Sequence, residues 1–407
     1  MRIAFHGTSA SIEVPDRPEF LDTLRAVAID WPFAEAADND EPLVTVLRTG
    51  GKYAIVAPGE EVLETSAVSA ACSVVVDVVK AYIDENPSRL CFHCGSVVIN
   101  GRLVLFPNQY RAGKSTLVAR LAASGHEIYG DDVLPLSEAD DHGVALGVAP
   151  RLRLPLPENA GAAFRRFVTE CSGPRDDRYL YLRLPQGSLA PRNSTAPLGA
   201  VVLLDRRPRG PASLSEASRS ATLQALIVRN FARAAPAGDL LERLHRVMDR
   251  LPRFTLHYSD LDEAASLLEA TFSAWPPRIG ALASADPPLS VVDISSDGAA
   301  TRARLAGVRL KQNPAVKLHA VDGELFLADA EGTAIHHLNA IGAGLWNLLA
   351  DAIDEVEAVE VLCGAFPAVE RAMVARDVRE LFDALAAGGF IVETLPPADC
   401  NGTGIPS

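Results

Sequence analysis

Residues 107–117 read Pro-Asn-Gln-Tyr-Arg-Ala-Gly-Lys-Ser-Thr-Leu, and they decide the fold of the larger part of the chain. An apolar run, 103–106, precedes this stretch, and a helical pattern over 115–123 follows it. A strand, a tight loop and a helix in that order form a cradle whose backbone N–H groups and helix dipole attract an anion. The sequence therefore predicts an α/β fold around a loop that binds a nucleoside triphosphate or another phosphate donor.

The loop matches the pattern G-x-x-x-x-G-K-[ST] except at its first glycine position, which is Asn108. Asn tolerates left-handed backbone better than most residues that carry a side chain. Arg111 stands at a second position that is often Gly, where it adds a cation near the phosphates or points outward. Lys114 is predicted to reach the terminal phosphates, and the Ser115 hydroxyl to bind a Mg²⁺ ion. The loop residues predicted to contact the bound phosphates are Asn108, Arg111, Ala112, Gly113, Lys114, Ser115 and Thr116.

Composition places the chain among globular proteins of two or three domains. It has 407 residues, of which 48% are apolar and 22% charged, and its net charge is −14. The sequence lacks the concentration of Lys and Arg that marks proteins binding DNA or RNA, so we expect no nucleic-acid partner. No apolar run approaches the length of a membrane span, and the first residues lack a signal-peptide core. We therefore expect a cytoplasmic protein without a membrane partner.

Cys91-Phe92-His93-Cys94 contains the one closely spaced pair of cysteines. A C-x-x-C pair serves redox chemistry or forms half of a zinc site, but no second pair stands at a suitable spacing. The pair runs directly into the apolar residues 95–99, so we expect buried side chains in a strand. His336-His337 lies away from Cys and acidic ligands in the sequence, and we expect structural roles for both histidines.

Periodicity and turn signals divide the chain into four segments. Residues 1–88 form an N-terminal α+β portion of the phosphate-binding region, and 89–274 form the phosphate-binding domain itself. Residues 275–303 are rich in Pro, Ala, Ser, Asp and Gly, which is typical of a linker. Residues 304–395 contain short strands followed by three helices, a pattern that indicates a small winged-helix-like domain.

Shorter signals place individual elements within these segments. Gly-Gly at 50–51 and Asn-Gly at 100–101 predict two hairpins, the second joining strands 92–99 and 102–106. Residues 66–85 carry apolar side chains at helical spacing, and 173–178 are expected to form a loop.

Asp131 and Asp132 lie 17 and 18 residues beyond Lys114, at the end of the next predicted strand. In a parallel strand–helix–strand unit, that position is beside the phosphate loop. One carboxylate is then placed to act as a base while the other binds Mg²⁺, directly or through water. The alternative is a polar turn that caps a helix or strand. His93 lies on a strand that the second hairpin brings alongside, where it donates to a phosphate oxygen or is a satisfied core residue.

Together, His93, the loop up to Lys114-Ser115, and Gly130-Asp131-Asp132 resemble the C-terminal kinase domain of HPr kinase/phosphorylase. That family shares its core with phosphoenolpyruvate carboxykinases. The resemblance is specific over roughly 90–135, and it is closer to the HPr-kinase-like proteins encoded with peptide-modification systems, some of which phosphorylate a Ser of a precursor peptide. It implies ATP and Mg²⁺ as cofactors, and a homo-oligomer is possible because HPr kinases assemble as hexamers.

The same resemblance implies a role for each matched residue. Asp131 is the general base, Lys114 clamps the phosphates and His93 contacts them. Asp132 and Ser115 are linked to the metal. The family also supplies basic residues from later loops to the phosphate, and Arg151 and Arg153 are the candidates in this chain.

The last segment resembles PqqD, a leader-peptide recognition domain of pathways that modify ribosomally made peptides. The residues that carry this resemblance are Asn313-Pro314, 324–332, 337–339, 342–346, 377–378, 385 and 389–392. Such domains bind an extended leader by adding it as a strand to a sheet edge. The acidic balance of the segment disfavours a DNA-binding wing.

The two resemblances predict an HPr-kinase/PEP-carboxykinase-like P-loop domain followed by a small winged-helix-like PqqD domain. We expect an ATP-dependent Ser/Thr kinase that modifies a precursor peptide whose leader binds residues 304–395. One alternative is a regulatory HPr-type protein kinase/phosphorylase acting on a folded carrier protein. Another is a non-catalytic, nucleotide-gated peptide chaperone, because Asn108 and Arg111 depart from the Gly-rich loop of the family. An enzyme acting on a small metabolite is a further possibility.

Overall fold

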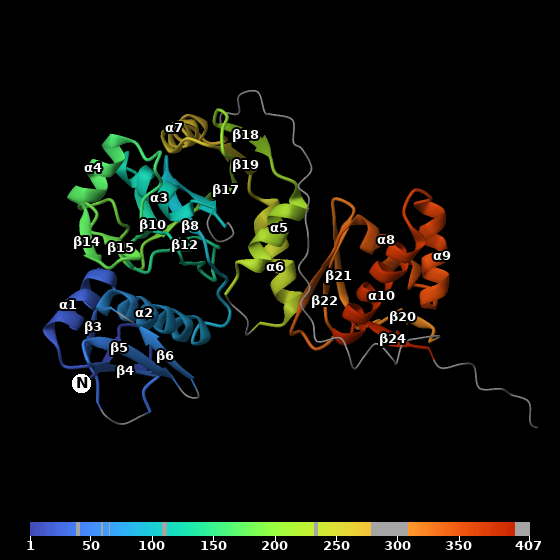
Figure 1. Cartoon of the computed structure of the whole chain (residues 1–407), viewed down its shortest axis with the longest axis horizontal. Coiled ribbons are helices and arrows are strands. Elements are labelled where there is room, and N and C mark those ends of the chain that lie inside the picture. The colour runs from blue at the N-terminus through green and yellow to red at the C-terminus, as the bar shows by residue number, and fades with distance from the viewer. Residues whose placement is uncertain are drawn as a thin grey trace, which may run out of the picture. The chain divides into compact units, whose positions relative to one another are not determined.

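The computed structural model describes residues 1–37, 41–57, 60–64, 66–107, 112–231, 235–277 and 308–394 (Figure 1). The chain forms two units, residues 1–235 with 244–286 and residues 236–243 with 287–407. The predicted linker, 275–303, lies outside the described residues except for 275–277, and Asn108 and Arg111 also lie outside them. In the described part of the chain, no helix combines the length and the hydropathy needed to cross a membrane.

The central sheet of the first unit contains the strand that precedes the phosphate loop. Its order is β10 (Glu127–Gly130), β8 (Gly95–Ile99), β9 (Arg102–Phe106), β17 (Leu198–Arg206), β19 (Arg253–Tyr258) and β18 (Ser213–Glu216). β9, β17 and β19 are parallel, so their carboxyl ends meet at one edge, while β8 and β18 are antiparallel to their neighbours. Helix α3 (Lys114–Ala123) begins after β9. The prediction of a mixed α/β architecture is confirmed.

The turn at Asn100-Gly101 joins β8 to β9, as the sequence predicts. Both residues have positive φ, 49° and 79°, and the strands pair with Val97 opposite Val104. Asn and Gly adopt this left-handed backbone more readily than other residues, and two such residues give a turn whose twist matches that of the strands. The hairpin therefore fixes the register of the phosphate-loop strand against β8.

Helices α3 and α7 (Leu261–Thr271) pack with the central sheet in one core. Leu117, Val118 and Leu121 of α3 are fully buried against sheet residues such as Val104 and Phe106. Full burial of such a side chain contributes about 1.5–3 kcal/mol, which holds the start of α3 firmly against the sheet. Helix α5 (Arg219–Val228) also belongs to this unit, and α6 (Ala237–Asp249) is divided between the two units at residues 243 and 244.

A smaller sheet lies beside the central one in the chain's first unit. Its order is β13 (Arg151–Arg153), β15 (Tyr179–Leu182) and β14 (Ser172–Arg175), with α4 (Ala162–Glu170) connecting β13 to β14. The prediction of a loop over 173–178 is wrong in its first half, because β14 pairs antiparallel with β15. Two short pairs complete the region, β7 (Cys91–Phe92) with β11 (Leu134–Pro135), and β12 (Gly143–Val144) with β16 (Thr195–Ala196).

The strand predicted over 92–99 is interrupted at His93 and Cys94. There the backbone N–H of His93 donates to Arg229 O at 2.6 Å instead of to a sheet neighbour, so β7 ends and β8 begins anew. Cys91 and Cys94 are both fully buried and free, which confirms the expectation of buried side chains. Burial raises the pKa of the Cys94 thiol to about 12.

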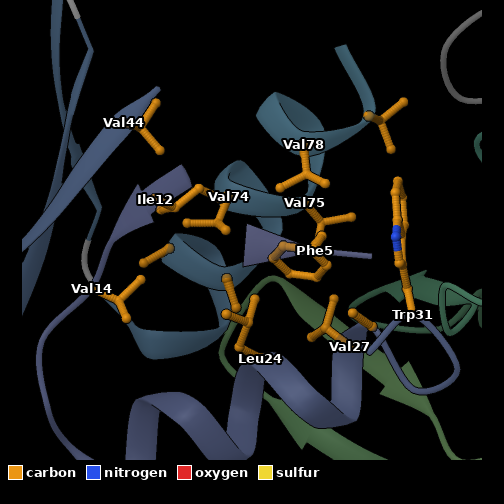
Figure 2. Packing of buried hydrophobic residues seen from close by; sticks show 14 of the residues in the cluster. Phe5, Ile12, Val14, Leu24, Val27, Trp31, Val44, Val74, Val75 and Val78 are labelled. Carbon is orange, nitrogen blue, oxygen red and sulfur yellow. The ribbon is translucent and has the colours of Figure 1, made fainter. Parts of the chain in front are cut away.

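The N-terminal part forms a six-stranded sheet with two helices packed against it. The sheet order is β3 (Phe33–Glu35), β1 (Arg2–Phe5), β2 (Ser11–Glu13), β4 (Val44–Thr49), β5 (Lys52–Ala57) and β6 (Glu60–Glu64), and the helices are α1 (Pro18–Val27) and α2 (Ala67–Asp84). Figure 2 shows Val74 and Val78 of α2 packed with Ile12 and Leu24. The predicted hairpin at 50–51 and the predicted helix over 66–85 are both confirmed.

The second unit contains a three-stranded sheet and three helices. The sheet order is β21 (Lys317–Val321), β22 (Glu324–Ala328) and β23 (Ile335–Leu338); β20 (Leu310–Gln312) pairs with β24 (Ile391–Glu393), and the helices are α8 (Ala340–Leu348), α9 (Glu355–Ala365) and α10 (Arg371–Ala387). Trp346, Phe382 and Leu385 lie in its core. His337 Nε2 lies 2.7 Å from Glu324 Oε2, and its ring stacks on Phe326. These contacts agree with the structural role expected of His337.

Candidate active site

Strand β10 delivers Asp131 and Asp132 to the edge where the phosphate loop begins. A Cβ at Gly130 would lie 2.5 Å from Val133 O, so only Gly permits the turn that follows this strand. β10 and β9 run in the same direction, as predicted, but β8 lies between them and is antiparallel to both. The carboxylates therefore come from the far side of β8.

Lys114 is the first residue of α3 and reaches Asp132. Gly113 precedes it with φ of 87°, a left-handed conformation that starts the helix without a side-chain cap. The Lys114 ammonium lies 3.2 Å from Asp132 Oδ1, and its side chain is only 10% exposed. Ser115 and Thr116 follow in the first turn, where backbone N–H groups have no partner within the helix. A helix terminus with a cation beside it is a common place for a phosphate to bind.

Three side chains contact the carboxylate of Asp132. Lys114 Nζ and His93 Nε2 each lie 3.2 Å from Oδ1, and Arg151 Nη2 lies 2.9 Å from Oδ2. Burial by itself would raise the pKa of Asp132. The hydrogen bond with His93 and the charges of Lys114 and Arg151 outweigh burial and lower that pKa well below its usual range. Asp132 is therefore ionised at neutral pH.

Burial and the charges of Lys114 and Arg151 act on both carboxyls, but the side chain of Asp131 lacks the direct contacts with Lys114 and His93 that Asp132 makes. It is 4% exposed, and its Oδ2 accepts a hydrogen bond from the backbone N–H of Arg151 at 3.0 Å. Burial raises the pKa of Asp131 to about 7, and the charge of Asp132 adds to the rise. A carboxyl group with a pKa near the working pH is suited to accept and return a proton. Adjacent carboxyls whose pKa values are shifted in opposite directions are an arrangement that enzymes use for acid–base chemistry.

The predicted phosphate contacts Arg151 and Arg153 both come from β13, opposite Tyr181 and Tyr179. Arg151 lies within the site through its contacts with Asp131 and Asp132. Its guanidinium also contacts Cys72 Sγ of α2. Arg153 lies two residues further along the same face and is exposed. The structure therefore brings His93, Lys114, Asp131, Asp132 and Arg151 together and leaves Arg153 at the edge of the group.

Three residues of this site carry no signal in the sequence. Phe231 stacks on His93, with ring centroids 5.4 Å apart. The Tyr258 hydroxyl, at the end of β19, donates to Ala112 O at 2.9 Å and so holds the end of the loop. Tyr179 lies against the guanidinium of Arg151. Each of these residues reaches the site because its segment pairs with a segment far away in the sequence. The spacing of residues along the sequence does not reveal such pairing.

The donor groups at this edge fit a Mg²⁺ ion that arrives with a nucleotide. In the ranges that the structure describes, no group of three or more His, Cys, Asp or Glu side chains is arranged to hold a metal by itself. Mg²⁺ in phosphoryl-transfer sites commonly uses one or two carboxylates together with phosphate oxygens and water. The ionised Asp132 and the Ser115 hydroxyl supply donors of that kind.

The sequence predicts that this loop binds ATP, and replacing Gly113 by Ala is then expected to weaken that binding by about tenfold or more, measured by titration calorimetry. Left-handed backbone costs a residue with a Cβ about 1–2 kcal/mol. At this position the new Cβ would also lie 2.4 Å from Tyr258 Oη. Tyr258→Phe removes that oxygen and also the hydrogen bond to Ala112 O, so it serves as a second background. Gly113→Ala should lower the affinity less in the Tyr258→Phe background than in wild type, and equal losses in the two backgrounds would contradict the steric explanation.

Comparison with known proteins identifies one part of the chain. Residues 324–391 match the family described as "Coenzyme PQQ synthesis protein D (PqqD)", so the second unit contains a PqqD domain. A solved structure, "TbiB1 in Complex with the TbiA(beta) Leader Peptide", is 30% identical over 20% of this chain and 93% of that chain, with a TM-score of 0.19. No curated protein sequence matches the chain.

Proposed function

We propose that this protein is an ATP-dependent Ser/Thr kinase that modifies a ribosomally made precursor peptide, whose leader is bound by the PqqD domain of the same chain. The observation that carries the proposal is the pair of adjacent carboxyls beside Lys114, one ionised and the other with a pKa of about 7. Phosphoryl transfer to a hydroxyl needs a phosphate clamp and a group that accepts the hydroxyl proton. The pair supplies the second of these, and Lys114 with the start of α3 supplies the first.

Each residue of the site has a separate role in the proposed reaction. Asp131 accepts the proton of the acceptor hydroxyl as that oxygen bonds to the terminal phosphorus of ATP, and the bond from this phosphorus to the bridging oxygen breaks to release ADP. Asp132 orients Lys114 and His93, both of which lie 3.2 Å from the same oxygen. The backbone N–H of Arg151 donates to Asp131 Oδ2 and so leaves Oδ1 for the substrate. A Mg²⁺ ion held through Asp132 and Ser115 would neutralise charge on the transferred phosphoryl group.

The PqqD domain supports a peptide as the acceptor. The family resemblance of residues 304–395 implies leader recognition, and a leader bound by strand addition leaves the rest of the peptide extended. A domain on a short tether raises the local concentration of its cargo to the millimolar range. The acceptor hydroxyl then reaches Asp131 without strong contacts of its own.

Isolated leader peptide is expected to inhibit phosphorylation of the full precursor competitively. It should raise the KM of the precursor in proportion to its concentration and leave kcat unchanged, because it occupies the PqqD domain and not the reacting centre. Steady-state rates with the full chain, a precursor encoded beside its gene and a scrambled leader as the control measure this effect. A leader that leaves KM unchanged at saturating concentration would contradict the assignment of the domain.

A further inference from the structure

Three arginine side chains surround one aromatic ring at the edge of the site. The guanidinium carbons of Arg151, Arg178 and Arg153 lie 4.6, 5.2 and 5.8 Å from the centre of the Tyr179 ring. All three distances fall within the range of cation–π attraction, about 6 Å. These four residues form what we call the Tyr179 cluster. It concentrates positive charge in a chain whose net charge is −14.

The cluster is held in place by the carboxylate of Asp176. One oxygen of this carboxylate accepts hydrogen bonds from the backbone N–H groups of Arg178 and Tyr179, each at 2.8 Å. The other accepts from the hydroxyls of Ser66 and Ser69, at 2.6 and 2.8 Å, at the start of α2. Burial opposes ionisation of Asp176, but these four bonds lower its pKa. The turn that carries Arg178 and Tyr179 is therefore fixed to the start of α2.

The two oxygens of Asp132 contact different cationic side chains. Lys114 contacts Oδ1, whereas Arg151, the member of the cluster nearest the site, contacts Oδ2. A phosphate donor binds on the side of Lys114, at the start of α3. In-line transfer places the attacking hydroxyl opposite the leaving oxygen. The acceptor hydroxyl then approaches beside Asp131, whose Oδ2 accepts a hydrogen bond from the backbone N–H of Arg151, a member of the Tyr179 cluster.

We propose that Arg153 and Arg178 of the Tyr179 cluster bind a carboxylate of the acceptor peptide, near the hydroxyl that is phosphorylated. This inference rests on the proposed kinase function and names the class of its acceptor, an acidic peptide. A guanidinium stacked on an aromatic ring keeps its N–H edge available for bidentate contact with a carboxylate. The Arg153 and Arg178 side chains are exposed, and Arg178 Nη2 also donates to the Tyr179 hydroxyl at 3.4 Å.

The spacing of Arg151 and Arg153 along β13 predicts how far the carboxylate lies from the acceptor hydroxyl in the peptide. Arg151 and Arg153 are two residues apart on one face, roughly 7 Å along a strand. An extended peptide advances by the same distance in two residues. The carboxylate is therefore expected about two residues from the acceptor hydroxyl, supplied by an Asp or Glu side chain or by the end of the peptide.

Peptide libraries with a central Ser test the proposal on the full chain. Each library fixes Asp, Asn or Lys at one flanking position and is used at about 1 mM, the concentration a short tether provides, with labelled ATP and Mg²⁺. A further pair of peptides ends two residues after Ser in a free or an amidated terminus. Wild type, Arg153→Glu, Arg178→Glu and the control Arg166→Glu, an exposed residue of α4, are compared.

Wild type and the control are expected to prefer Asp over Asn by about tenfold at one position, the gain of one charge-assisted contact. Preference for the free terminus instead would assign the carboxylate to the chain end. Both cluster variants should lose this preference and favour Lys. If peptides with Asp, Asn or either terminus incorporate equal amounts of labelled phosphate, the inference is overturned and the proposed kinase function still stands. No incorporation into any library overturns both the inference and the proposed function.

Discussion

Replacing Asp131 by Asn is expected to lower the rate of phosphoryl transfer to a bound precursor by about 10²–10⁴-fold, the usual contribution of a general base. The amide keeps the shape of the side chain and accepts the hydrogen bond from Arg151, but it does not take up the hydroxyl proton. Single-turnover rates with saturating ATP and peptide measure the loss. Asp22→Asn, an exposed change on α1, is the control. A variant within threefold of wild type would remove Asp131 from the mechanism.

The pKa of Asp131 gives the same prediction a pH signature. Because burial raises this pKa to about 7, the base is protonated below neutrality. The transfer rate of wild type should fall about tenfold per unit as the pH drops below 7. The pKa is also higher in the folded than in the unfolded chain, where it is about 3.9. Asp131 therefore contributes to the free energy of unfolding fully below pH 4, and this contribution is lost as the pH rises to 7.

Asp131→Asn should therefore melt at a higher temperature than wild type at pH 8, and this difference should vanish near pH 4. The comparison separates the two ways in which the variant loses activity. A variant that is inactive and more stable at pH 8 has lost the base, whereas one that is inactive and less stable at pH 8 has lost its fold.

Replacing Lys114 by Met is expected to lower kcat by about 10²–10³-fold, the loss typical of removing one preorganised donor from a transferring group. Met fills most of the space of the buried Lys stem, so the start of α3 stays packed. The charge that neutralises the terminal phosphates is lost, and ATP affinity falls with it. Calorimetric ATP titration and single-turnover rates measure the two effects.

Lys80→Met provides a matched control for this change. Lys80 lies on α2, is 68% exposed on its side chain and pairs only at the surface with Asp77. Its replacement should leave kcat and ATP affinity unchanged. If Lys114→Met retains kcat within threefold while the control behaves as expected, phosphate clamping at the start of α3 is wrong.

Most elements of the fold follow from local pattern. The turns at 50–51 and 100–101, the helices of the second unit and the strand before the phosphate loop were predictable, because turn residues and apolar periodicity specify them locally. The pattern did not reveal that β8 lies between β9 and β10, because strand order depends on pairing between distant segments. It also missed β14, where Gly173 and Pro174 indicate a loop but pairing with β15 imposes a strand.

The sequence likewise predicts some residues of the candidate site and misses others. Lys114, Asp131 and Asp132 stand at a spacing that the sequence reveals, and the structure brings them within contact. The residues that position them do not share a motif with them. Tyr258 reaches the loop from the end of β19, and the Tyr179 cluster depends on the register of β13 with β15. Such contacts arise only when non-local strands pair, and the divergent pKa values of Asp131 and Asp132 arise with them.

Kinase activity is tested by the intact mass of a precursor peptide, encoded beside this gene, after incubation with the full chain, ATP and Mg²⁺. A peptide kinase adds about 80 Da, one phosphoryl group, to the part of the peptide that follows the leader. The gain should be absent with Asp131→Asn. A precursor that binds the protein and keeps its mass would contradict the kinase function and favour a nucleotide-gated peptide chaperone.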